Sequence, residues 1–153
     1  MKKKSTLIIS IAVPLVIGGA AALITNGAFR DFQNVAQPPL SPPAWLFPVV
    51  WTVLYILMGI SCYLYIKSGG AKDKGLYFYG VSLLFNFLWP ILFFSGRMFL
   101  TALIVLALLW ICVFLTINEY LKRSSTAGYL QIPYLIWSTF AFYLNLSIWI
   151  LNK

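Results

Sequence analysis

Five long apolar runs constrain this chain more than any other feature of its sequence. Each run is long enough to cross the roughly 30 Å hydrocarbon core of a bilayer, which takes about 20 helical residues. The runs are continuous and show no alternation at period two, so we expect helices rather than barrel strands. The sequence therefore predicts an all-α integral membrane protein, one domain over residues 1–153 folded as a five-helix transmembrane bundle. The predicted spans lie at about residues 6–25, 45–66, 76–95, 98–121 and 129–151.

The composition agrees with this class and excludes several functions. Hydrophobic residues make up 61% of the chain and charged residues 9%, whereas soluble domains average roughly 45–50% and about 25%. The chain has no histidine, and its only acids are Asp31, Asp73 and Glu119. Most hydrolytic, metal-dependent and proton-relay chemistry uses carboxylates and imidazoles. We therefore expect no metal site and no obligatory cofactor, and we interpret Cys62 and Cys112, which lie in apolar runs, as small buried residues.

The basic residues sit between the apolar runs, where membrane topology explains them better than nucleic-acid binding does. The amino terminus and the second and fourth connectors carry eight of the 11 Lys and Arg residues. Because cytoplasmic loops are enriched in Lys and Arg, the amino terminus is predicted to be cytoplasmic in a bacterial plasma membrane. The first run is too long for a signal-peptide core and is expected to be a helix of the mature protein.

One connector, residues 26–44, is much longer than the others. Four prolines at its end (Pro38, Pro39, Pro42 and Pro43) restrict its backbone. Long loops in compact domains are usually functional or disordered. We interpret this one as a lid over the outer end of the bundle.

Three of the predicted helices carry a face that combines large aromatic side chains with a few polar ones. Mainly apolar and aromatic walls with few placed polar groups are typical of ligand pockets. These faces predict a pocket between the second, third and fifth helices. They consist of Trp51, Tyr55, Met58 and Cys62, of Tyr79, Ser82, Asn86, Trp89 and Phe93, and of Tyr134, Trp137, Ala141 and Asn145.

Several of these residues have two interpretations. Asn86 and Asn145 either bond a neighbouring helix or contact a ligand, because an amide in lipid needs partners. Trp51 and Trp137 lie about two turns inside their helices, where an indole N–H needs an acceptor or a ligand to stack on. Arg30 either holds a ligand carboxylate at the pocket mouth or is a solvated loop charge.

The small residues of the first run also have two interpretations. Gly18-xxx-Ala22 fits the small-xxx-small pattern that lets membrane helices approach closely. The pair serves either internal packing or a dimer face.

Three motifs then resemble those of a known family, and together they extend over essentially the whole chain. QPPLSPPAWLFPVVWTVLYILMG at residues 37–59 is similar to the signature of the TspO/MBR family, the translocator proteins once called peripheral benzodiazepine receptors. NFLWPILFF at 86–94 and PYLIWSTFAFYLNLSIWILN at 133–152 resemble the third-helix and fifth-helix motifs of that family.

The resemblance implies a five-helix membrane protein, often dimeric, that binds porphyrins such as protoporphyrin IX. Family members are receptor-like, sensory or transport proteins, and related members bind cholesterol and isoquinoline carboxamides. Some promote light- and oxygen-dependent porphyrin breakdown through two tryptophans, which by motif position are Trp51 and Trp137. The pocket asparagine of the family falls on Asn86 and its small fifth-helix residue on Ala141.

The chain departs from the family pattern in a few places. Ala44 and Pro48-Val49 replace the usual Gly and Gly-Pro. Leu144-Asn145 is followed by Leu146 where the sterol-recognition pattern needs a Tyr, so sterol binding there is not expected. Tyr77 and Val81 stand where glycines can form a third-helix dimer face, so a homodimer would need other packing.

The expected site is thus a porphyrin-sized pocket beneath the 26–44 lid. A tetrapyrrole-binding receptor or transporter is the first hypothesis, photo-oxidative porphyrin degradation by Trp51 and Trp137 is the second, and a ligand-free scaffold is the third. Without histidine, imidazole cannot ligate a metalloporphyrin iron, which favours a metal-free tetrapyrrole. The predicted ligand contacts are Trp51, Tyr55, Asn86, Trp89, Trp137, Ala141, Asn145 and Arg30.

Overall fold

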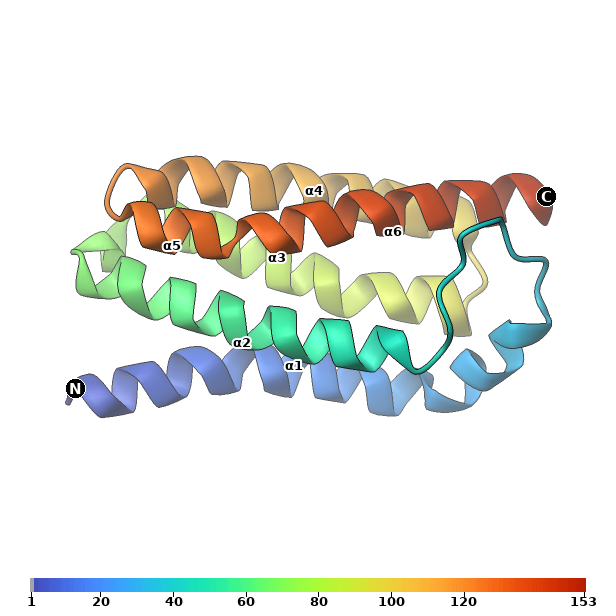
Figure 1. The fold of residues 1–153 in the computed structure, drawn as a ribbon, viewed down its shortest axis with the longest axis horizontal. Coiled ribbons are helices and arrows are strands. Elements are labelled where there is room, and N and C mark those ends of the chain that lie inside the picture. The colour runs from blue at the N-terminus through green and yellow to red at the C-terminus, as the bar shows by residue number, and fades with distance from the viewer. Residues whose placement is uncertain (1) are drawn as a thin grey trace.

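The computed structural model describes residues 2–153, which form an elongated bundle of near-parallel helices (Figure 1). Five helical spans are long and apolar enough to cross a membrane, and residues 2–153 contain no β-strand. The predicted all-α, five-span fold is therefore confirmed. The α-helices are α1 (Lys3–Asp31), α2 (Leu46–Lys67), α3 (Lys74–Pro90), α4 (Phe99–Leu121), α5 (Ser125–Leu130) and α6 (Ile132–Leu151), and the short segments are η1 (Phe32–Asn34), η2 (Gly70–Lys72) and η3 (Ile91–Ser95).

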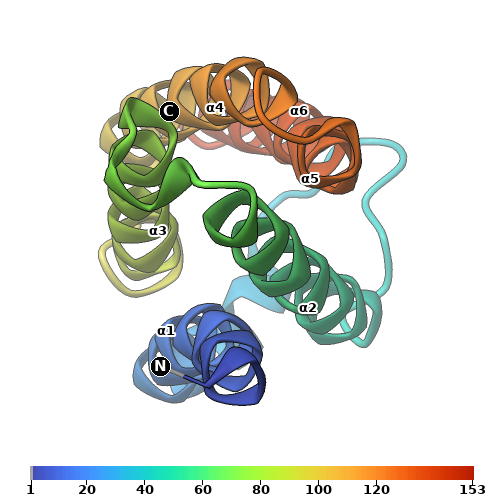
Figure 2. The ribbon, with the colours of Figure 1, turned by 90° about the vertical axis from the view of Figure 1, so that its left-hand side faces the viewer.

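Helix α1 lies at one edge of the bundle, where it packs on α2 and α3 (Figure 2). It is the least buried of the five spans. Its contact with α2 is close at Gly59, where an added Cβ atom would lie 2.5 Å from the Ile11 Cα atom and 2.7 Å from the Ser10 carbonyl oxygen. Only a residue without a side chain permits this crossing, since the obstacle is backbone.

Two predicted boundaries differ from the structure. The first helix continues to Asp31 and then through η1, so the connector is shorter than 26–44 and comprises residues 35–45, which we call the lid loop. No proline interrupts the chain between Pro14 and Pro38. Beyond residue 25, Gly27 is the one glycine of α1, and it does not stop a helix that packs on α2 and α3.

The last span is broken into α5 and α6 at Gln131. Pro133 occupies the second position of α6. A backbone N–H at this position would have no acceptor within the helix, so proline costs no helical hydrogen bond there. The Ser124 side chain caps α5 by accepting a 3.3 Å hydrogen bond from the Ala127 N–H.

The third span ends in a π-helical turn, η3, directly after Pro90. The Gly96 N–H donates to the Ile91 carbonyl at 2.9 Å, five residues back instead of four. The consecutive residues Phe93 and Phe94 of this turn are both buried. Turns of this kind are frequent at functional sites.

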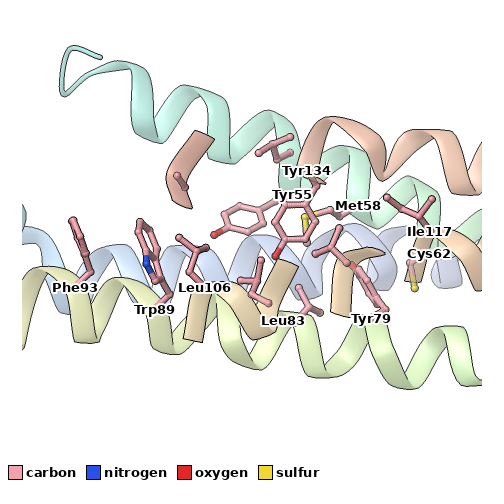
Figure 3. Packing of buried hydrophobic residues seen from close by; sticks show 14 of the residues in the cluster. Tyr55, Met58, Cys62, Tyr79, Leu83, Trp89, Phe93, Leu106, Ile117 and Tyr134 are labelled. Atoms are coloured by element: carbon pink, nitrogen blue, oxygen red, sulfur yellow. The ribbon is translucent and has the colours of Figure 1, made fainter. Parts of the chain in front are cut away.

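The interior is aromatic along much of its length (Figure 3). Toward the amino-terminal end, Tyr65 and Tyr120 stack with their ring centroids 4.0 Å apart. At the opposite end the lid loop crosses the bundle and is fixed to α6 (Figure 1). The Tyr143 hydroxyl donates to the Pro39 carbonyl at 3.0 Å, and the Asn152 amide donates to the Ala36 carbonyl at 3.2 Å.

Candidate ligand-binding site

Two adjacent cavities lie in the half of the bundle that the lid loop covers. The first, about 380 Å³, lies between α1, α2, α3 and η3, and we call it the α1-side cavity. The second, about 230 Å³, lies between the lid loop, α2, η3 and α6, and we call it the lid-side cavity. Ligand pockets typically measure roughly 300–1,000 Å³, so the α1-side cavity alone reaches that range.

The wall shared by the two cavities consists of aromatic residues. Several of these rings touch edge to face, with centroids 5.1 Å apart for Phe29 and Phe94 and 6.0 Å apart for Trp89 and Phe94. Such contacts favour a defined geometry beyond simple burial. The residues that line both cavities are Phe29, Phe47, Trp51, Trp89 and Phe94.

The structure brings most of the predicted ligand contacts to these cavities. Trp51 and Trp89 line both, Tyr55 and Asn86 line the α1-side cavity, and Trp137, Ala141 and Asn145 line the lid-side cavity. Arg30 lines neither, because α1 extends past it and leaves its side chain exposed at the helix end.

Both membrane-depth asparagines bond neighbouring helices, which is one of the two interpretations given above. Asn86 accepts a hydrogen bond from the Tyr55 hydroxyl and donates one to the Tyr134 hydroxyl, each at 2.8 Å. Asn145 accepts from the Trp89 indole N–H at 3.0 Å and donates to the Phe99 carbonyl at 2.9 Å. These amides therefore tie α2, α3, α4 and α6 together around the cavities.

The two deep tryptophans are held differently. Trp51 stacks on Tyr55, with ring centroids 5.6 Å apart and planes 27° apart, and meets Tyr134 edge to face at 6.1 Å. The buried indole N–H of Trp137 has no hydrogen-bond partner among the residues that the structure describes. An unpartnered buried donor costs about 1–3 kcal/mol, so an acceptor close to Trp137 would be stabilised there.

Sequence reasoning predicted the loop as a lid but missed the contribution of α1 and the polar side chains near the lid. Thr25, Asn26 and Phe29 of α1 line the α1-side cavity, but no repeating aromatic face marks this helix. The sequence marks Gly18 only as one of the small residues of the first helix. An added Cβ atom there would lie 2.1 Å from a Tyr55 ring carbon, so Gly18 serves internal packing. The polar side chains at the lid are Gln33, Gln37 and Ser41.

Among residues 2–153, none of those that line the cavities carries a charged side chain. Residues 2–153 contain no cluster of His, Cys, Asp or Glu that could hold a metal ion. The walls offer aromatic faces, a few amides and hydroxyls, and burial from water. Such walls can bind, stack and orient a flat apolar molecule.

These features define an integral membrane protein with an aromatic cavity inside a five-helix bundle. The sequence pattern of the TspO/MBR family matches residues 10–150, and the chain belongs to that family.

Curated relatives agree with this assignment. The chain is 35% identical to the tryptophan-rich protein TspO of Chlorobaculum tepidum, over 99% of this chain and 98% of that protein. It is 37% identical to the tryptophan-rich sensory protein of Cereibacter sphaeroides, over 89% and 88% of the two chains. It is 34% identical to the translocator protein of Bos taurus, over 90% and 84%.

Proposed function

We propose that this protein is a membrane receptor or transporter that binds a tetrapyrrole such as protoporphyrin IX in the two cavities beneath the lid loop. The observation that carries the proposal is the shared aromatic wall, with Trp51 facing both cavities, in a site without charged walls. A macrocycle presents two extended π-faces, and stacking on Trp51 and Trp89 would add to the hydrophobic gain of leaving water. The names of the relatives, sensory and translocator protein, are consistent with this role.

The cavity dimensions suggest how such a ligand would be held. Neither cavity alone is large, so a macrocycle would displace part of the shared ring wall and occupy both. Ionised carboxylates on the ligand are costly to bury without a partner. They would therefore remain at the lid, near Gln33, Gln37 and Ser41.

The proposed orientation places the lid outside and the amino terminus in the cytoplasm of a bacterial cell. The amino terminus lies at the same end of the bundle as the α2–α3 and α4–α5 connectors (Figure 1). These segments carry Lys2, Lys3 and Lys4 together with Lys67, Lys72, Lys74, Lys122 and Arg123. The cytoplasmic excess of Lys and Arg supports this orientation.

A fluorescence titration tests binding. Protoporphyrin IX added to the purified protein in detergent is expected to quench tryptophan emission saturably. Trp51→Phe should raise Kd by about tenfold, as expected for loss of a central aromatic contact. Trp110→Phe is the matched control, because Trp110 lines neither cavity and donates to Thr139 at 2.8 Å. Folded wild-type protein that shows no saturable quenching would reject the proposal.

A second candidate function is light- and oxygen-dependent degradation of the bound porphyrin. The observation that favours it is that Trp51 and Trp137 both line the lid-side cavity, although they come from helices far apart in sequence. Under illumination in air, the porphyrin absorbance should decay faster with wild-type protein than with Trp51→Phe or Trp137→Phe at equal occupancy. Equal decay with free tryptophan would remove this function and leave the binding proposal intact.

A further inference from the structure

The indole of Trp51 is held between two tyrosine rings that come from different helices. Tyr55 stacks on it at 5.6 Å, and Tyr134 meets it edge to face at 6.1 Å with an interplanar angle of 74°. Tyr134 is 1% exposed and lines neither cavity. Any effect of Tyr134 on a ligand therefore passes through its neighbours.

A single amide fixes both tyrosines. Asn86 accepts from the Tyr55 hydroxyl and donates to the Tyr134 hydroxyl, so α3 sets the distance between a ring on α2 and a ring on α6. Figure 3 shows Tyr55 and Tyr134 converging from these two helices. All three side chains are buried, so a lost hydrogen bond would leave a buried polar group without its partner. The bridge thus holds the two rings in one arrangement.

The backbone of α1 closes this arrangement from behind. An added Cβ atom at Gly18 would lie 2.1, 2.4 and 2.8 Å from three ring carbons of Tyr55. The Tyr55 ring therefore lies directly against α1. A methyl group at this position would displace the ring from its place beside Trp51.

We propose that Gly18 and Tyr134 are positioning residues for the ligand site. Gly18 acts through its contact with the Tyr55 ring, and Tyr134 acts through its hydrogen bond with Asn86 and its edge contact with Trp51. Together they set the angle at which the Trp51 indole faces a bound tetrapyrrole. This inference rests on the proposed function for its ligand, but not for the geometry of Trp51. Gly18 and Tyr134 thereby decide the pose of the macrocycle, although Tyr134 does not reach it.

Two substitutions test the proposal against a matched control. Gly18→Ala introduces the colliding methyl group, and Tyr134→Phe removes the hydroxyl that Asn86 bonds while keeping the ring. Gly27→Ala is the control for Gly18→Ala, because it is the same substitution on the same helix. An added Cβ atom at Gly27 meets nothing within 4 Å, and Gly27 lines neither cavity. If Gly18→Ala does not fold, Tyr134→Phe decides the outcome.

The readout is the circular dichroism that bound protoporphyrin IX acquires in its Soret band, together with Kd. Gly18→Ala and Tyr134→Phe are expected to change the shape or sign of that signal and to raise Kd by roughly three- to tenfold, as loss of one buried contact would. Gly27→Ala should match the wild type. Wild-type spectra and affinities in both test variants would overturn the proposal.

A ligand-free measurement separates this proposal from the proposed function. In each background, the near-ultraviolet circular dichroism is measured with and without Trp51→Phe, and the difference isolates the environment of Trp51. Gly18→Ala and Tyr134→Phe should alter the difference spectrum, while Gly27→Ala should not. If the wild type binds no porphyrin, this experiment still decides the positioning role, since an unchanged difference spectrum would refute it.

Discussion

Replacing Asn145 with leucine should destabilise the protein, because it leaves one buried hydrogen-bond donor without an acceptor. Asn145 accepts the Trp89 indole N–H at 3.0 Å and donates to the Phe99 carbonyl at 2.9 Å. Phe99 lies in the first turn of α4, and its carbonyl can accept within the helix, so that oxygen keeps a partner. Once Asn145 is replaced, the indole N–H of the buried Trp89 has no acceptor. Asn145→Leu keeps the approximate volume and leaves that donor unpaired.

The structure allows the magnitude to be worked out. An orphaned buried donor costs about 1–3 kcal/mol, and hydrogen bonds between membrane helices average about 0.6 kcal/mol with a maximum near 1.7. The expected loss in the free energy of unfolding is therefore about 1–2 kcal/mol. Asn118→Leu is the control, because Asn118 is exposed and bonds only the Phe114 carbonyl one turn away in its own helix. It should change stability by less than about 0.5 kcal/mol.

A double-mutant cycle then identifies the cause. Trp89→Phe removes the donor, so Asn145→Leu should cost less in that background, with a coupling energy of about 1 kcal/mol. Unfolding is followed by circular dichroism during titration of detergent-solubilised protein with a denaturing detergent. Additive effects, within about 0.3 kcal/mol, would refute the assignment of the cost to the Trp89 N–H.

Three further predictions follow from contacts elsewhere in the bundle. Gly59→Ala should lower the free energy of unfolding by at least about 2 kcal/mol, because its methyl group would meet the α1 backbone. Gly80→Ala is the control, since an added Cβ atom there meets nothing within 4 Å. Equal melting temperatures for the two variants would contradict this prediction. Removing both lid contacts by Tyr143→Phe and Asn152→Ala should accelerate amide exchange in the lid loop and ligand dissociation, and exchange as slow as in the wild type would show that other contacts hold the loop. Ala141→Leu should fill part of the 230 Å³ lid-side cavity and raise Kd for protoporphyrin IX by about tenfold, while an unchanged affinity would place the ligand elsewhere.

The spans and half of the site could be predicted because their signals are local. Twenty apolar residues in lipid have few alternatives to a helix. The spacing of Trp51 and Tyr55, and of Asn86 and Trp89, places each pair on one helix face whatever the neighbours are. The structure accordingly finds all four side chains at the cavities.

The remainder depends on tertiary contacts that the sequence does not display. Gly18 lines the site because Tyr55 from another helix needs its space, and no pattern within α1 records that. The π-helical turn after Pro90, in which Phe93 and Phe94 are both buried, likewise depends on how η3 packs. One of the two interpretations of Arg30 placed it at the pocket mouth. In the structure its neighbours Phe29 and Phe32 line the lid-side cavity, but the Arg30 side chain is exposed, and which side of the helical turn faces inward depends on tertiary packing.

The aromatic wall between the two cavities makes their occupancies interdependent. Phe29, Phe47 and Trp51 belong to both linings, so a molecule on one side fixes the surface that the other side presents. By thermodynamic linkage, a ligand in one cavity that changes the affinity of the other cavity by some factor has its own affinity changed by the same factor. Two small ligands, one in each cavity, and one broad planar ligand that spans both would then compete for the same aromatic wall. Titration of one ligand in the presence of another would measure their coupling directly.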